Sequence, residues 1–447
     1  MNTVVPSHDD PLIATNSELI GGPMGKFSNG NRWWSPLRVI LILTALGYAV
    51  GYWLDSACRN TSWASPQRYE HLCYTDIHPF FSLKGFADGV FPYLGNAKPE
   101  QLLDSPVLVG IFMELSARIT SLLNGVWPVD DQAVTFFDVT VLLLFLVLVT
   151  VVVTTVKTVS KRPWDAAMIA LAPMMILAAT ISWDLLAIAF VSLAFWAQNK
   201  NKNRATGFFL GLALCSSNYP IAVVIAFIVL AARTKEWKKT ANLVGVAAIT
   251  WLVINVPFVL AHYDGWVVIY RRVLDCGAEL GSPWYALTQI GGPTLSTPML
   301  NVLSLLLFAA AVAAIAAITI RAPRTPRLAQ VAFLVVAAFA LTAKGFSPQF
   351  SLWLIPLAVL ARPRWRDFLI WQACEVTYFV AVWWFLAGYN VEGAKGLTPQ
   401  WYSVATVVQI IGTLYFAYRV IEDINAPAQY AVLVAIPDQA QHQSATS

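Results

Sequence analysis

A carboxylate in a long loop is the first feature that could do chemistry. Asp76 lies in the segment CYTDIHP at 73–79, inside a loop rich in Trp and Pro that follows the first hydrophobic stretch of a very apolar chain. At the boundary between lipid and outside water, a carboxylate can accept a proton from a hydroxyl of a membrane-held substrate, provided the two are in hydrogen-bond contact. We therefore predict that Asp76 is a catalytic base. The alternative is a structural role, as a helix cap or as the salt-bridge partner of Lys84 or Arg68.

Three cations on the predicted outer side could bind an anion. Arg271 and Arg272 are adjacent in a later loop, and Lys344 stands at a break, rich in Gly and Pro, between two hydrophobic stretches. Arg suits phosphate because its planar guanidinium offers a fork of donors, whereas Lys acts as a point charge. We predict that these cations bind a phosphate group. For the two arginines, pairing with lipid headgroups is an equal alternative.

Further polar side chains could contact a substrate. Asp184 lies at the start of a predicted helix, and an ionised carboxylate in so apolar a setting is costly, which points to function. A plain N-cap after Ser182 is the alternative, because Asp favours that position. Sugar hydroxyls could be contacted by Tyr93, Asn218, Gln349 and, unless it merely faces the lipid surface, His78.

Two of the five cysteines share the first long loop. Cys58 and Cys73 lie on the predicted outer side, where an oxidising environment favours disulfides. We expect a bridge that ties the loop down near Asp76. Two unpaired thiols are the alternative.

Several common motifs are absent. The chain has no G-x-x-x-x-G-K-[ST], no G-x-G-x-x-G that opens a helix, no H-E-x-x-H and no Cys/His cluster with zinc spacing. Nucleotide hydrolysis and zinc chemistry are therefore not expected. Because the first-loop motif holds no adjacent pair of acids, we expect no obligatory metal cofactor, although a divalent cation that bridges Asp76 and a phosphate stays open.

The composition is that of a membrane protein. Of the 447 residues, 57% are hydrophobic and only 12% are charged, against roughly 25% charged residues in soluble domains. Residues 1–36 are polar and show no signal-peptide pattern. Hydrophobic stretches predict an all-α polytopic protein with about twelve spans, at 37–54, 136–156, 164–181, 183–198, 205–217, 221–232, 243–260, 300–320, 329–342, 350–360, 368–386 and 401–418.

Charge gives the predicted spans an orientation. Alternate threading gathers most of the 29 Lys and Arg residues at one end, which is the cytoplasmic end by the positive-inside tendency. Both termini are then cytoplasmic, and two long loops, at 55–135 and 261–299, face outward. The apolar stretch 106–123 carries Glu114 and Arg118, and counting it as a crossing would reverse the charge bias. We expect an interfacial or re-entrant helix there.

The region 207–233 must cross out and back as two short helices between basic clusters. Each half covers only about 20 Å, less than the ~30 Å hydrocarbon core. The tip SSNYP at 216–220 therefore ends below the outer surface. Polar backbone at that depth is tolerated only where protein buries it or a watery cavity reaches it. We predict a cavity open to the outside.

Short motifs follow one another in a distinctive order. They are Cys58, Trp63, Tyr69, CYTDI at 73–77, KGF at 84–86, Gly89, PY at 92–93, SPVL at 105–108, SWDLLA at 182–187, GSPWY at 281–285 and KGFSPQFSLW at 344–353. Their order and placement, over about 37–418, resemble the actinobacterial polyprenol-phosphate-sugar-dependent glycosyltransferases of the GT-C superfamily, specifically glycosyltransferase family 87. No single motif decides the resemblance.

The resemblance implies a GT-C-like bundle with an extracytoplasmic catalytic loop. In that family an Asp of the first outer loop is taken as the catalytic base, and Asp76 occupies its place. The donors are lipid-phosphate sugars such as polyprenyl-phosphate mannose or arabinofuranose, and the acceptors are cell-envelope glycolipids and polysaccharides. The chain departs from the pattern at Asn218, where relatives often carry Lys, at 104–108, and near Cys276, where an expected Arg is missing. Because of these departures, the resemblance does not determine which sugar or acceptor is used, or how the donor phosphate is bound.

Together, these features predict a membrane glycosyltransferase that moves a sugar, mannose or arabinofuranose, from a polyprenyl-phosphate donor to an envelope acceptor with inversion. Asp76 would take the acceptor proton, and Lys344 with Arg271 or Arg272 would stabilise the departing phosphate. No nucleic-acid partner is expected.

The predicted layout is a disordered cytoplasmic tail at 1–36, a transmembrane domain at 37–420 in the plasma membrane, and a cytoplasmic tail at 421–447. The main alternative is a secondary transporter or flippase for a lipid-linked sugar, although transporters commonly show repeated halves with midplane sites. A non-catalytic scaffold for envelope assembly is a third class.

Overall fold

The computed structural model describes residues 35–94, 97–128, 131–160, 162–388 and 396–426, so most of both predicted tails lies outside the described residues. The described chain is helical, without a strand, and the prediction of an all-α polytopic membrane protein is confirmed. The elements are α2 (Pro36–Leu54), α3 (Ser56–Arg59), α4 (Gln67–Glu70), α5 (Ile77–Leu83), η1 (Phe86–Asp88), η2 (Pro99–Gln101), α6 (Val107–Val126), α7 (Gln132–Thr158), η3 (Pro163–Ala166), α8 (Ala167–Ala170), α9 (Pro173–Ala178), α10 (Leu185–Asn199), α11 (Asn203–Leu214), α12 (Pro220–Thr234), α13 (Trp237–Ala261), α14 (Tyr263–Asp275), α15 (Pro283–Gln289), α16 (Thr297–Arg321), α17 (Leu328–Thr342), η4 (Pro348–Phe350), α18 (Ser351–Ala361), α19 (Trp365–Leu386) and α20 (Pro399–Asn425).

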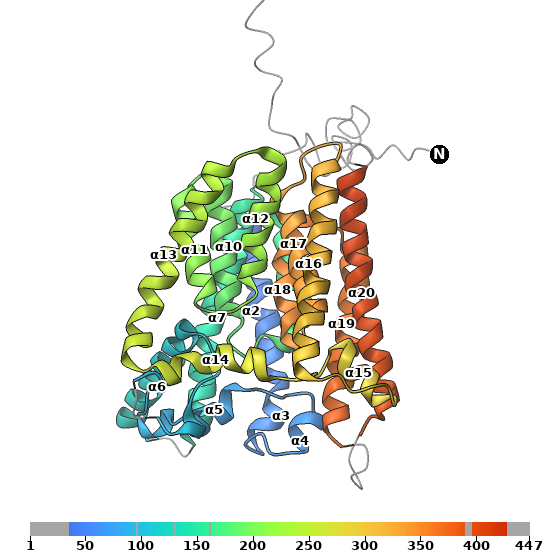
Figure 1. The fold of residues 1–447 in the computed structure, drawn as a ribbon. Coiled ribbons are helices and arrows are strands. Elements are labelled where there is room, and N and C mark those ends of the chain that lie inside the picture. The colour runs from blue at the N-terminus through green and yellow to red at the C-terminus, as the bar shows by residue number, and fades with distance from the viewer. Residues whose placement is uncertain (1–34, 95–96, 129–130, 161, 389–395, 427–447) are drawn as a thin grey trace, which may run out of the picture.

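The long helices form one bundle with two distinct ends (Figure 1). The short helices α3, α4, α5 and α15, together with α6 and α14, gather at its lower end in the view. The described chain begins with α2 and ends with α20 at the opposite, upper end. The two predicted outer loops therefore meet at one end of the bundle.

Seven described helices are long and apolar enough to cross a membrane by length and composition: α2 with α3, α6, α7, α13, α16, α19 and α20. Shorter apolar helices are α10, α12, α17 and the pair η4 and α18. The predicted count of about twelve spans is not confirmed. Helix α6 lies at the lower end with the loop helices (Figure 1), and its interfacial placement stays a prediction.

The span predicted at 164–181 is wrong as a continuous helix. The chain there forms η3, α8 and α9 in succession. Pro173 has no backbone N–H to continue a helix, and it disfavours helical backbone at the residue before it. Ala172 is accordingly extended, with φ −63° and ψ 122°.

Two glycines of α2 let its backbone lie against this broken segment. A Cβ on Gly47 would lie 2.8 Å from the carbonyl oxygen of Ala170, and a Cβ on Gly51 would lie 2.2 Å from that of Ile176. Small residues allow such close approach between membrane helices. The broken segment is thereby fixed to α2.

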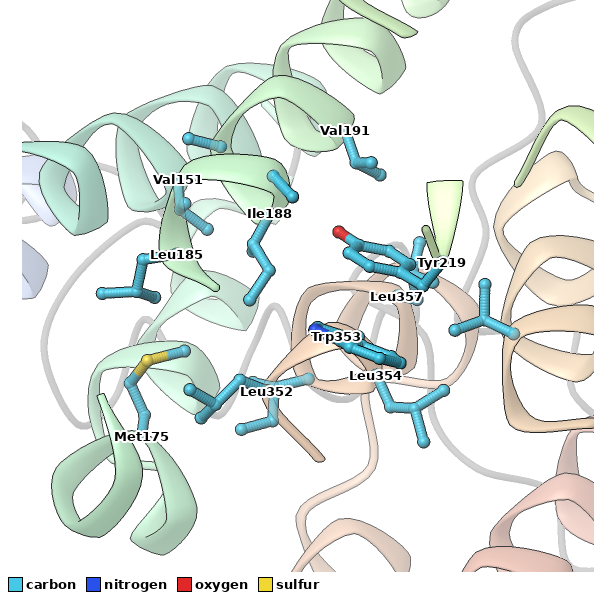
Figure 2. Close-up of a cluster of buried hydrophobic side chains, with 14 of the residues drawn as sticks. Val151, Met175, Leu185, Ile188, Val191, Tyr219, Leu352, Trp353, Leu354 and Leu357 are labelled. Carbon is cyan, nitrogen blue, oxygen red and sulfur yellow. The ribbon is translucent and has the colours of Figure 1, made fainter. Parts of the chain in front are cut away.

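The core lies around α18, in which every residue is buried. Figure 2 shows Leu352 of α18 on the side of Leu185 and Ile188 of α10, in one buried cluster with Val151 of α7. By contrast, α13 and α16 bury little of their surface within the chain. Their exposed faces are apolar, as expected where lipid covers them.

Candidate functional site

The segment that carries Asp76 is fixed to the turn before α10. The hydroxyl of Thr75 donates to the carbonyl oxygen of Thr180 at 2.8 Å, and the backbone N–H of Asp76 donates to that of Ile181 at 2.9 Å. Thr75 Oγ1 also accepts from the backbone N–H of Ile77 at 3.1 Å. The backbone on either side of Asp76 is therefore held by hydrogen bonds rather than free as in a mobile loop.

A disulfide closes the loop upstream of this segment. Cys58 and Cys73, the pair expected from the sequence, are joined with a Cα–Cα distance of 6.1 Å. Between them, the indole N–H of Trp63 donates to the carbonyl oxygen of Cys73 at 2.8 Å. The rings of Trp63 and His78 stack at 4.6 Å between centroids, which places His78 against the loop.

The carboxylate of Asp76 is partly buried and makes a single hydrogen bond within the described chain. Tyr74 donates its hydroxyl proton to Oδ1 at 2.7 Å. Burial raises the pKa of Asp76 to about 6, and the nearby charges of Asp104 and Asp184 add to the rise, whereas the Tyr74 hydroxyl and Arg68 oppose it. A carboxylate with such a pKa is ionised at neutral pH and is more basic than an ordinary Asp.

Neither structural alternative for Asp76 is found among the described residues. Asp76 stands at the N-cap position of α5, yet its side chain makes no capping hydrogen bond. Lys84 Nζ donates instead to the carbonyl oxygen of Leu102 at 2.7 Å, and Arg68 donates to the hydroxyl of Tyr69 at 2.9 Å. Among the residues that the structure describes, the carboxylate therefore has no cation within salt-bridge distance.

Asp76 lines a cavity of about 1730 Å³ near the end of the bundle that carries the loop helices. One wall is apolar and consists of residues from α11, α12 and α13, including Ile221, Val244 and Leu252. Ser217 of the tip between α11 and α12 also faces the cavity, as predicted for polar backbone at that depth. Charged lining residues are Asp76, Lys84, Glu100, Asp104, Arg272, Glu279 and Lys344.

Lys344 lines the cavity and is held by neutral acceptors. Its Nζ donates to the carbonyl oxygen of Cys276 at 2.7 Å, to Asn301 Oδ1 at 2.5 Å and to the carbonyl oxygen of Leu274 at 3.4 Å. Within the described chain it makes no ion pair. These contacts fix the ammonium in place while leaving its positive charge uncompensated by a carboxylate.

The two adjacent arginines are placed differently. Arg272 lines the cavity and pairs with Asp104 at 3.1 Å and with Glu279 at 3.7 Å. Arg271 is not part of that lining and faces a smaller pocket of about 340 Å³, with Asp264 at 3.9 Å. Of the two arginines, only Arg272 lines the cavity, and it already pairs with two acidic side chains.

Asn218 and Gln349 also line the cavity, and their contact with a substrate stays a prediction. Gln349 is only 8% exposed, and its Oε1 is buried without a hydrogen-bond partner in the described chain. Tyr93 lies elsewhere, buried, with its hydroxyl donating to the carbonyl oxygen of Ser105. Its position is that of a packing residue.

Asp184 lies behind the cavity wall. It occupies the N-cap position of α10 but makes no capping hydrogen bond. Instead, Ser182 donates to its Oδ2, and the indole N–H of Trp353 donates to its Oδ1 at 2.7 Å. Because Trp353 lines the cavity and stacks on Tyr219 at 4.7 Å (Figure 2), Asp184 supports the wall rather than facing a ligand.

Three aromatic rings beside Asp76 were not predicted as site residues. Tyr74 stacks on Trp383 at 4.5 Å between centroids and on Tyr69 at 5.7 Å, and all three line the cavity. Tyr69 and Tyr74 lie near Asp76 in the sequence, and this proximity could have identified them as candidate site residues. Trp383 comes from α19, more than 300 positions away, and only the fold brings it here.

The described residues contain no group of three or more His, Cys, Asp or Glu side chains placed to hold a metal ion. The expectation that no metal is obligatory stays a prediction, as does a divalent cation between Asp76 and a phosphate.

Comparison with solved structures shows a likeness in fold, whereas comparison of the sequence does not. No family model matches the sequence, and no curated protein matches it. The chain is similar to the crystal structure of ArnT from Cupriavidus metallidurans bound to undecaprenyl phosphate, with 12% sequence identity and a TM-score of 0.41, over 87% of this chain and 78% of that one. We assign no family from this likeness, and the resemblance to glycosyltransferase family 87 stays a prediction.

Proposed function

We propose that the protein is a membrane glycosyltransferase. It transfers a sugar, mannose or arabinofuranose, from a polyprenyl-phosphate donor to a hydroxyl of a cell-envelope glycolipid or polysaccharide. The observation that carries the proposal is that Asp76, Lys344 and an apolar wall line the same cavity. The carboxylate of Asp76, with its raised pKa, suits an acceptor hydroxyl. The ammonium of Lys344, which makes no ion pair in the described chain, suits a phosphate, and the apolar wall suits a lipid chain.

The proposed reaction is a single displacement. The acceptor oxygen forms a bond to the anomeric carbon while its proton passes to Asp76. The bond from the anomeric carbon to the phosphate oxygen breaks, and its electron pair leaves with the polyprenyl phosphate. Lys344 stabilises the charge that develops on that phosphate. Attack from the face opposite the leaving group inverts the anomeric centre.

The proposal also fixes the arrangement in the cell. The cavity opens on the outer face of the plasma membrane, and both termini are cytoplasmic, as the distribution of Lys and Arg indicates. Arg272 has a lesser part in binding the donor phosphate, because Asp104 and Glu279 already contact it.

The test uses purified protein in lipid nanodiscs with labelled polyprenyl-phosphate mannose and polyprenyl-phosphate arabinofuranose, and with envelope glycolipids as acceptors. Wild type is expected to transfer one of the two sugars, and Asp76→Asn to lose about 10²- to 10⁴-fold in rate. Asp88→Asn is the matched control, because Asp88 is an exposed acid of the same loop that does not line the cavity.

Two outcomes would contradict the proposal. In proteoliposomes, movement of a lipid-linked sugar across the bilayer without transfer would identify a flippase. Full transfer activity in Asp76→Asn, at wild-type expression, would show that Asp76 is not the base.

A further inference from the structure

We propose that Tyr74 is a positioning residue for the base: its hydroxyl holds Oδ1 of Asp76, so that Oδ2 is left to accept the proton of the acceptor hydroxyl. The inference rests on the proposed function and deepens it, because it divides the two carboxylate oxygens between two tasks.

The hydrogen-bond pattern separates the two oxygens. Oδ1 accepts from Tyr74 at 2.7 Å. Oδ2 accepts no hydrogen bond within the described chain and is not among its buried unpaired atoms, so it is accessible. Since Asp76 lines the cavity, that accessible oxygen is the one a ligand can reach.

Stacking contacts hold the Tyr74 ring, and with it the hydroxyl, in place beside Asp76. It stacks on Trp383 at 4.5 Å with 24° between the ring planes, and on Tyr69 at 5.7 Å with 12°. The guanidinium carbon of Arg68 lies 4.7 Å from the centroid of Tyr69 and 5.6 Å from that of Tyr74. A clamped ring restricts the side chain, and restriction of this kind is what precise positioning of a catalytic group requires.

Tyr74 acts as a hydrogen-bond donor throughout. Burial, together with the charge of Asp76, raises the pKa of Tyr74 far above its usual value, so the phenol stays protonated. During the reaction the acceptor proton moves to Oδ2, and Tyr74 keeps its own proton on Oδ1. The tyrosine is therefore neither acid nor base in the step.

Burial has the largest effect on the pKa of Asp76, and four groups from different parts of the chain add to it or oppose it. Asp104, before α6, and Asp184, at the start of α10, disfavour its ionised form, whereas Tyr74 and Arg68 favour it. Of the two favourable groups, Tyr74 alone touches the carboxylate. Its removal should therefore make Asp76 harder to ionise.

The experiment compares kcat/KM for sugar transfer between pH 5 and 9 in wild type, Tyr74→Phe and Tyr69→Phe. Tyr69 is the matched control, since it belongs to the same stack and cavity but its hydroxyl accepts from Arg68 instead of contacting Asp76. In Tyr74→Phe, the acidic limb of the profile should move up by about one pH unit, a tenfold change in proton affinity. At pH 9, where Asp76 is ionised in both proteins, the rate of Tyr74→Phe should stay below that of wild type because the carboxylate is no longer positioned. Tyr69→Phe should keep the wild-type limb.

An unchanged limb in Tyr74→Phe, with or without a uniform loss of rate, would overturn the inference, because packing alone predicts no shift. Should Tyr74→Phe fail to fold, 3-fluorotyrosine at position 74 replaces it. That residue is a stronger donor, so the limb should move to lower pH, and an unmoved limb counts against the proposal.

Asp76→Asn separates this inference from the proposed function. If wild type transfers no sugar, the function itself fails. If wild type transfers sugar, Asp76→Asn is inactive and the Tyr74→Phe limb coincides with that of wild type, then only the role of Tyr74 fails.

Discussion

The chemistry of Asp76 depends on its neighbours more than on its residue type. Burial makes its charged form costly, and the single hydrogen bond from Tyr74 only partly offsets that cost. The balance leaves a carboxylate that is ionised at neutral pH yet basic enough to take a proton.

The activity of the wild-type protein should fall on the acidic side. A base acts only when ionised, so kcat/KM should be half-maximal near pH 6, where the raised pKa of Asp76 lies, and should decrease about tenfold for each pH unit below it. For an ordinary Asp the same limb would lie near pH 4. The check is a pH–rate profile for sugar transfer, and a limb at pH 4 would contradict the role of burial.

Lys344→Met should lower the rate of transfer about 10²-fold, because the charge on the departing phosphate loses its stabilising cation. Lys84→Met is the control, since Lys84 also lines the cavity but donates to the carbonyl oxygen of Leu102. The measurement is kcat with saturating polyprenyl-phosphate sugar, alongside the thermal midpoint of each variant. Equal losses in the two variants would mean that the cavity needs positive charge in general rather than Lys344.

At the level of single residues, the sequence indicated some of the side chains that line the cavity, but not their hydrogen-bond and stacking partners. Asp76, Asn218, Lys344 and Gln349 were predicted as site residues and all line the cavity. Arg271 and Arg272 could not be separated, because neighbouring residues on a helix point about 100° apart and the rotation of α14 was unknown. The stacking of Tyr74 on Trp383 likewise depends on contacts far apart in the chain.

Among the helices, the broken segment of η3, α8 and α9 does not line the cavity but helps to hold the segment that carries Asp76. It packs on α2 through Gly47 and Gly51 and leads into the turn whose carbonyl groups, at Thr180 and Ile181, bind the Asp76 segment. Packing of α2 is thereby linked to the position of Asp76.

Gly51→Ala should destabilise the protein and reduce transfer. The added Cβ would lie 2.2 Å from the carbonyl oxygen of Ile176, and overpacking of this kind costs about 1–3 kcal/mol. Gly245→Ala is the control: a Cβ there meets nothing within 4 Å, and the change should raise stability by up to about 1 kcal/mol. Thermal midpoints of unfolding in detergent measure both effects. Equal midpoints for wild type and Gly51→Ala would show that α2 does not need the close approach to Ile176.

The apolar patterns predicted where most helices lie, because hydrophobic runs of sufficient length leave few alternatives. They failed at 164–181, where the run is mostly apolar but Pro173 interrupts the backbone. Composition alone also could not place α6. Its length and apolarity suit a span, whereas its place beside the loop helices (Figure 1) depends on tertiary packing.

For the whole molecule, the proposed orientation makes one cysteine a reporter of the cavity. Cys276 is partly exposed and lines the cavity, whereas Cys215 is buried and Cys374 lies within α19. A membrane-impermeant maleimide should label Cys276 in intact cells, and Cys276→Ser should abolish the labelling. Added polyprenyl phosphate should slow the reaction. Labelling of Cys276 only in inside-out vesicles would reverse the proposed orientation.

Helix α16 buries little of its surface against the rest of the protein, yet its Asn301 holds the ammonium of Lys344. The rest of α16 is therefore expected to contact the acyl chains of the lipid. Bilayer thickness and fluidity should therefore affect the position of Lys344 in the cavity. If the proposed function holds, turnover in short-chain detergent should differ from turnover in native lipid.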